Sequence, residues 1–111
     1  MRRLIVAPLF AASLALAQSP PPAAPFEFAL ETGKINEVCV RLAKGEKRRY
    51  HWKATAPVDF NIHYHEGNEV FYPVKRDAVM KDMDTFKAKI AQDYCWMWTA
   101  KATATIEGRI W

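Results

Sequence analysis

The stretch FNIHYHEGNEVFYPV, Phe60 to Val74, alternates apolar and polar residues on both sides of a Gly-Asn pair. Period-two alternation on either side of a turn predicts two antiparallel strands joined as a hairpin. Since neighbouring side chains of a strand point to opposite faces, one face of the first strand carries the apolar residues Phe60, Ile62 and Tyr64. The opposite, solvent-facing side then carries Asn61, His63 and His65. Pro73 cannot donate a backbone hydrogen bond, which predicts an edge position for the second strand.

The same alternation recurs from residue 35 to residue 111, with turn residues between the runs. Other runs are INEVCVRL, RRYHWKATA, TFKAKIA, YCWMWTA and ATATIEGRIW, and no long amphipathic helix interrupts them. KRDAVMKDMD breaks the alternation and predicts a loop or a helical turn. The pattern therefore predicts an all-β fold, an antiparallel β-sandwich of seven or eight short strands resembling a jelly roll. Tyr94, Trp96 and Trp98 share one strand face, which predicts an aromatic core whose polar ring atoms need hydrogen-bond partners.

The N-terminal segment has the three parts of an export signal. Arg2 and Arg3 precede a short apolar run, and Ala15-Leu16-Ala17 has the small-x-small pattern of a cleavage site. The apolar run is shorter than the roughly 20 residues that span a bilayer. We therefore expect a signal peptide over 1–17 with cleavage near Ala17, a Pro-rich linker over 18–34 and one domain over 35–111, in a periplasmic or secreted protein.

Charge gives little information about partners. The formal net charge is +4, and two of the positive charges belong to the predicted signal peptide. We expect no nucleic-acid partner, and a monomer or weak dimer that binds an unidentified protein or small ligand. The basic hairpin KGEKRRYHWK could make weak contact with an anionic membrane surface, or its charges could protect an edge strand from association. We favour edge protection.

Cys39 and Cys95 are the two cysteines, and they form no C-x-x-C motif. In an exported protein such a pair predicts a structural disulfide, which also removes the nucleophile of a cysteine-dependent enzyme. The sequence has no Gly-rich phosphate loop and no G-x-S-x-G motif, so we expect no enzymatic activity.

His63 and His65 lie two residues apart on one strand, so two imidazoles could bind one metal ion. Two ligands are too few for a tight site, and the candidate partners are the sulfur atoms of Met80, Met83, Met97 and Cys95. This mixed set favours Cu(I). A ligand role for Cys95 and a Cys39–Cys95 disulfide exclude each other. In the alternative, the histidines are part of a polar binding surface formed by Asn61, His63, His65, Glu66 and Asn68.

The order of these features resembles the GOLD (Golgi-dynamics) domain, a small β-sandwich of early secretory cargo receptors and some lipid-transfer proteins. The resemblance runs from Val38 to Ile110 and rests on EVCVRLAKGEK, VDFNIHY and FKAKIAQDYCWMW. It implies a disulfide between Cys39 and Cys95 and a non-catalytic interaction module. Asp93 departs from the family's turn glycine, and we expect no transmembrane helix after the domain, so the cargo-receptor role is not carried over. The leading hypothesis is a non-enzymatic periplasmic binding module, and the alternative is a periplasmic protein that binds Cu(I) or another soft metal.

Overall fold

The predicted hairpin is present, but its two strands are much longer than expected. In the computed structural model, which describes residues 24–111, β3 covers Lys47–Glu66 and β4 covers Glu69–Lys87. They pair antiparallel from Glu66↔Glu69 at the tip to Lys47↔Lys87 at the far end. The predicted signal peptide and its cleavage site lie outside the described residues.

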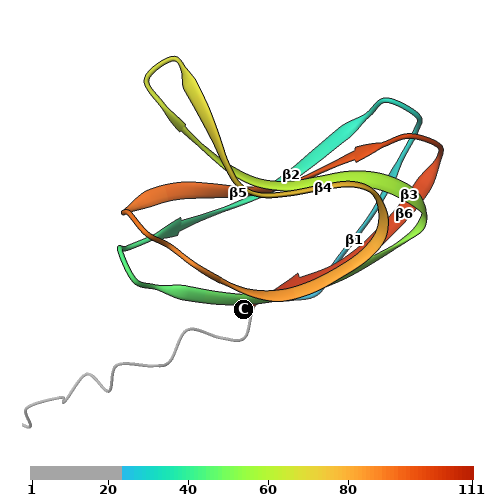
Figure 1. Ribbon diagram of the computed structural model, residues 1–111. Coiled ribbons are helices and arrows are strands. Elements are labelled where there is room, and N and C mark those ends of the chain that lie inside the picture. The colour runs from blue at the N-terminus through green and yellow to red at the C-terminus, as the bar shows by residue number, and fades with distance from the viewer. Residues whose placement is uncertain (1–23) are drawn as a thin grey trace, which may run out of the picture.

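Four shorter strands complete the fold: β1 (Phe26–Leu30), β2 (Ile35–Leu42), β5 (Gln92–Ala100) and β6 (Ala104–Ile110). Their order is β1-β6-β3-β5-β2, with β4 on the other side of β3, and every pair is antiparallel. The first part of β3 lies between β4 and β6, and its last part lies between β4 and β5. The sheet curls around its own apolar face, and the tip of the β3–β4 hairpin projects beyond the curl (Figure 1).

The prediction of an all-β antiparallel fold is confirmed, but the strand count is not. The described residues form one six-stranded sheet, because β3 and β4 continue through the bend at which the sequence predicted interruptions. KRDAVMKDMD lies within β4, so the predicted loop is wrong. The pairing absorbs the irregularity through shifts of register, and the Asp59 carboxylate accepts a hydrogen bond of 2.9 Å from the backbone N–H of Ala78, where φ is +51°. Among residues 24–111, no helix has the length and apolar character needed to cross a membrane.

Strand β1 lies inside the segment that was predicted to be a linker. It pairs with β6, and the rings of Phe26 and Phe28 lie 5.2 and 5.4 Å from the ring of Trp98. The linker prediction is therefore wrong from residue 26 onward. The period-two pattern of FEFAL was the available signal, but it directly follows the Pro-rich stretch and covers only five residues.

The core is largely aromatic, as the alternation predicted. Its largest fully buried side chains are Trp96, Trp98, Tyr50, Tyr94 and Phe60. The Tyr94 hydroxyl donates to the carbonyl of Ile90 at 2.8 Å, and the Tyr50 hydroxyl donates to Asp82 at 3.0 Å. The buried Nε1 atoms of the tryptophans at 52, 96 and 98 have no hydrogen-bond partner within the described residues. The predicted hydrogen-bond partners are therefore present for the tyrosine hydroxyls and not for the indole N–H groups of these tryptophans.

The basic segment does not form an edge strand. Residues 47–53 of β3 pair with β4 on one side, and residues 50–54 pair with β6 on the other, so edge protection is the wrong explanation of its charges. Two of these charges face carboxylates: Lys53 Nζ lies 2.7 Å from Glu107, and Arg48 lies 3.3 Å from Glu46. The predicted edge position of Pro73 is confirmed, because β4 pairs only with β3.

Cys39 and Cys95 form the predicted disulfide. They are direct partners in the β2–β5 register, with their Cα atoms 4.0 Å apart and 56 positions apart in sequence. The bond therefore joins strands that are distant in sequence, and it fixes the register of an edge strand. A disulfide is typical of an oxidising, extracytoplasmic compartment.

We expect the substitution Gly108→Ala to destabilise the domain by about 1–3 kcal/mol, as overpacking of a filled site does. A Cβ at this position would meet the backbone oxygen of His51 and would lie 2.7 Å from Trp52 Cβ and 2.9 Å from Phe26 Cζ. Urea unfolding followed by tryptophan fluorescence measures the change. Gly67→Asn is the control, because it has open space and a φ of +60° that asparagine tolerates. Equal free energies of unfolding for the two variants would contradict this packing argument.

Replacing both cysteines by alanine is expected to lower the free energy of unfolding by roughly 2–4 kcal/mol, because the unfolded chain loses a long covalent loop. The measurement is urea unfolding of the double variant beside the oxidised and the chemically reduced wild type. The variant and the reduced wild type should unfold at similar urea concentrations. If all three proteins unfold together, the disulfide does not stabilise the domain.

Candidate functional site

The outer face of the sheet, opposite the core, carries two rows of sulfur-containing and polar side chains across β2, β5 and β3. In the first row, Cys39 pairs with Cys95, and Cys95 pairs with His63. In the second row, Met97 of β5 pairs with both Glu37 of β2 and Asn61 of β3. The alternation that sends Trp96 and Trp98 into the core brings these six side chains to the other face.

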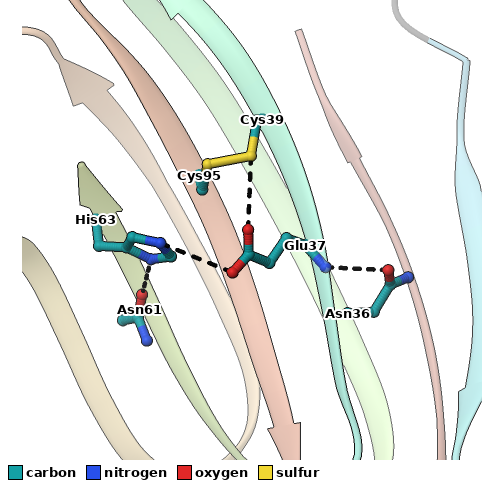
Figure 2. A network of polar contacts seen from close by, with 6 residues as sticks. All are labelled: Asn36, Glu37, Cys39, Asn61, His63 and Cys95. Carbon is teal, nitrogen blue, oxygen red and sulfur yellow. Dashed lines mark hydrogen bonds and ion pairs between the residues drawn. A yellow bond between two sulfur atoms is a disulfide. The ribbon is translucent and has the colours of Figure 1, made fainter. Parts of the chain in front are cut away.

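His63 was expected to face solvent, and this prediction is wrong. Its exposed fraction is 3 %, and that of Asn61 is 8 %, although both lie on the outer face. Figure 2 shows the His63 ring between Asn61 on one side and Glu37 on the other, next to the disulfide. The ring of Tyr72 lies 5.9 Å from that of His63. Strand alternation identified the correct face but could not show that neighbouring side chains cover it.

The two nitrogens of the His63 ring have different partners. Nδ1 lies 2.7 Å from Oδ1 of Asn61, and Nε2 lies 3.8 Å from Oε1 of Glu37. Because Oδ1 is an acceptor, Nδ1 carries a proton and donates it. Burial lowers the pKa of His63 and outweighs the opposing attraction of Glu37, and the neighbouring His65 adds a smaller lowering. His63 is therefore neutral near pH 7, and its Nε2 has a lone pair that faces the Glu37 carboxylate.

This arrangement suits a metal ligand. A histidine that binds a metal normally donates its second ring N–H to an oxygen, which fixes its tautomer and the direction of the free lone pair. Asn61 supplies that oxygen. Two ligand atoms on one tetrahedral Zn²⁺ lie roughly 3.3 Å apart, since each bond is about 2 Å long. The 3.8 Å between His63 Nε2 and Glu37 Oε1 needs only a small side-chain movement to reach that separation.

His65 lies beside this pair. Its ring is 5.3 Å from the His63 ring, at an interplanar angle of 81°, and its side chain is exposed. The structure therefore brings the two predicted histidines together, one buried and one accessible to solvent. An exposed imidazole next to a buried one can supply a further nitrogen to the same ion.

Two of the predicted sulfur ligands, Met80 and Met83, do not lie near the histidines, whereas Cys95 lies beside His63. Cys95 is bonded to Cys39, so its predicted role as a ligand is wrong for the disulfide-bonded protein. Met83 pairs with His51 at the opposite end of β3 and is 77 % exposed, and Met80 lies along the same part of β4. The break in alternation predicted a loop or helical turn that could fold these methionines over the sheet, whereas β4 holds them away from His63. Met97 alone among the predicted methionines lies in the neighbouring row.

Glu37 is a candidate ligand that the sequence analysis did not identify. Its ligand oxygen, the sulfur of Cys95 and a ring nitrogen of His63 all lie within 4.8 Å of one another. The available signal was its place two residues before Cys39: once the disulfide aligns β2 with β5, Glu37 must lie on the disulfide's face. Glu66 and Asn68, which were predicted for a binding surface, lie exposed at the tip of the hairpin beyond this cluster.

We expect His63 to make the domain less stable as the pH falls from neutral to about 5. Its pKa is lowered in the folded protein, so below the ordinary value of 6.5 the unfolded chain binds more protons and is favoured. Urea unfolding in the presence of a chelator, repeated across this pH range, measures the slope. His63→Gln should flatten it, and His51→Gln, at an exposed histidine, should not. Equal slopes for wild type and His63→Gln would contradict the prediction.

Comparisons with known proteins describe the fold only. The pre-peptidase C-terminal domain of a collagenase from Bacillus anthracis has a similar structure, with a TM-score of 0.60, 11% identity, and coverage of 81% of this chain and 90% of that chain. The Yersinia pseudotuberculosis-derived mitogen has a TM-score of 0.49 at 15% identity, covering 79% of this chain and 86% of that chain. No protein-family model and no curated protein matches. The GOLD resemblance stays a prediction, and the likeness to the collagenase domain shows an all-β fold.

Proposed function

We propose that this protein is a non-enzymatic, extracytoplasmic binding domain that binds a divalent transition-metal ion through His63, Glu37 and His65. One observation carries the proposal: a buried imidazole, fixed in one tautomer by Asn61, directs its free lone pair at a carboxylate. A lone pair and a carboxylate oxygen repel each other unless a cation or a proton donor lies between them. A bound cation satisfies both.

The ligand types favour Zn²⁺ or Cu²⁺ over the Cu(I) expected from sequence. Imidazole and carboxylate suit Zn²⁺ and Cu²⁺, whereas Cu(I) prefers thiolate and thioether. With Cys39 and Cys95 joined, Met97 is the remaining predicted sulfur ligand near the cluster. The metal therefore has two nitrogens and one carboxylate, and solvent reaches it from the side of His65.

The Cys39–Cys95 disulfide supports a non-enzymatic, extracytoplasmic binding domain in two ways. The disulfide persists in oxidising compartments, in agreement with the predicted export signal. It also removes both thiols, and with them the nucleophile that a cysteine-dependent enzyme would need.

We expect the disulfide-bonded protein to bind Zn²⁺ and Cu²⁺ with one ion per chain, as measured by isothermal titration calorimetry after treatment with a chelator. His63→Ala should abolish binding, because it removes the buried ligand. Glu37→Gln keeps the size of the side chain but removes its charge, and should weaken binding. Asn61→Ala should weaken binding by roughly 10- to 100-fold, as loss of a partner that orients a ligand does.

His51→Ala is the matched control, because His51 lies at the other end of β3, where its ring packs against Trp111. This variant should bind each ion as the wild type does. Binding that is unchanged by His63→Ala and Glu37→Gln, in protein with the far-ultraviolet circular dichroism of the wild type, would overturn the proposal. So would equal losses in His51→Ala and His63→Ala.

A further inference from the structure

The row Cys39–Cys95–His63 places two sulfurs and a histidine side by side on three adjacent strands. Pairing in register means that the three side chains rise from neighbouring points of one sheet face. The sulfur of Cys95 lies within 4.8 Å of ligand atoms of both His63 and Glu37. His63 is buried and directs its unprotonated nitrogen into this group. The disulfide is therefore part of the same cluster as the proposed metal ligands.

The oxidation state decides what this cluster can bind. Sulfur in a disulfide is a poor metal ligand, whereas a thiolate is a strong one that favours Cu(I) and Zn²⁺. Two thiolates on a tetrahedral Zn²⁺ lie roughly 3.8 Å apart, since each Zn–S bond is about 2.3 Å long. The Cα atoms of Cys39 and Cys95 are 4.0 Å apart, so rotation of the side chains provides this separation while the strands stay paired.

The two cysteines differ in their access to solvent. Cys39 lies exposed on the edge strand β2, and Cys95 is 8 % exposed on β5, between β2 and β3. An external thiolate therefore reaches the sulfur of Cys39 first. Its attack forms a mixed disulfide with Cys39 and releases the sulfur of Cys95 as a thiolate, beside Nε2 of His63.

We propose that reduction of the Cys39–Cys95 disulfide converts this cluster into a second, softer metal site, in which both thiolates and Nε2 of His63 bind a thiophilic ion, Cu(I) or Zn²⁺. The reductant is a dithiol. Its first sulfur bonds to Cys39, and its second then displaces Cys39, so that the dithiol becomes a disulfide and the protein gains two electrons and two protons. Metal binding releases these two protons. The inference rests on the proposed role of His63, but it adds a ligand set that exists only in the reduced protein.

Co²⁺ tests the inference directly, because Co²⁺ bonded to thiolate gives an intense charge-transfer absorption in the near ultraviolet and Co²⁺ bonded to nitrogen and oxygen does not. The full protein is reduced with a phosphine, which leaves no competing thiol, and is titrated without oxygen beside the oxidised protein. The reduced wild type should show the band, and the oxidised wild type should not. Competition with a chromophoric chelator should show tighter Zn²⁺ binding after reduction, by at least about tenfold.

Variants separate this inference from the proposed function. Replacing both cysteines by alanine should remove the band but keep the weaker binding of the oxidised protein. His65→Ala should weaken the oxidised site and leave the band of the reduced protein intact. His63→Ala should reduce the affinity of the reduced protein as well, and His51→Ala should change neither state. If the oxidised protein fails to bind metal while the reduced protein binds through His63, the proposed function is wrong and the inference stands.

Circular dichroism of the reduced, metal-free protein guards against a loss of folding. If that protein is unfolded, a metal ion that uses His63 should restore the β-sheet spectrum of the wild type and should not restore that of His63→Ala. The inference is overturned by a folded reduced protein without the band. It is also overturned by equal Zn²⁺ affinities before and after reduction. A reduced His63→Ala variant with the band intensity and the metal affinity of the reduced wild type would overturn it as well.

Discussion

The backbone pairing of strand β3 on both of its sides holds the whole sheet together. The first part of β3 is paired on both sides by β4 and β6, and its last part by β4 and β5. Because both parts belong to one continuous strand, β3 joins the β1–β6 pair to the β2–β5 pair around one apolar core. Each pair completes its hydrogen bonds on β3, so a curled sheet of six strands can cover the tryptophans without a helix.

The bend of β3 interrupts the regular pairing with β4, and a polar side chain bonds to the backbone there. The register shifts fall between Lys53 and Tyr64, and the Asp59 carboxylate accepts a hydrogen bond from the backbone N–H of Ala78 in this irregular part of the pairing. A strand that lacked such support would leave unpaired backbone groups at the bend. The run from Phe60 to His65 lies in this part of β3, and it carries both aromatic residues of the core and the two histidines of the candidate site.

The outer face shows how a polar cluster can be buried without lying in the core. The His63 end of the row is covered by its own neighbours: Glu37, the ring of Tyr72 and the second histidine. Burial lowers the pKa of His63 and keeps its imidazole neutral, and Asn61 determines which nitrogen is free. The disulfide sets the register that brings Glu37 within reach. A disulfide, a hydrogen bond and a charged side chain thus together determine the position and the protonation of His63 within three strands.

The amino-acid sequence was enough to predict the all-β class, the β3–β4 turn, the core faces of Phe60, Ile62, Trp96 and Trp98, and the Cys39–Cys95 bond. These depend on period-two alternation and on residue chemistry, which are local properties of the chain. The folded chain was needed to show that six strands replace seven or eight, that β1 belongs to the sheet, and that Glu37 rather than Met80 or Met83 lies beside His63. Register between strands that are distant in sequence determines those outcomes, because two residues become neighbours across a sheet only when the strands between them are aligned. The burial of His63 has the same origin, since alternation specifies a face but not the side chains that cover it.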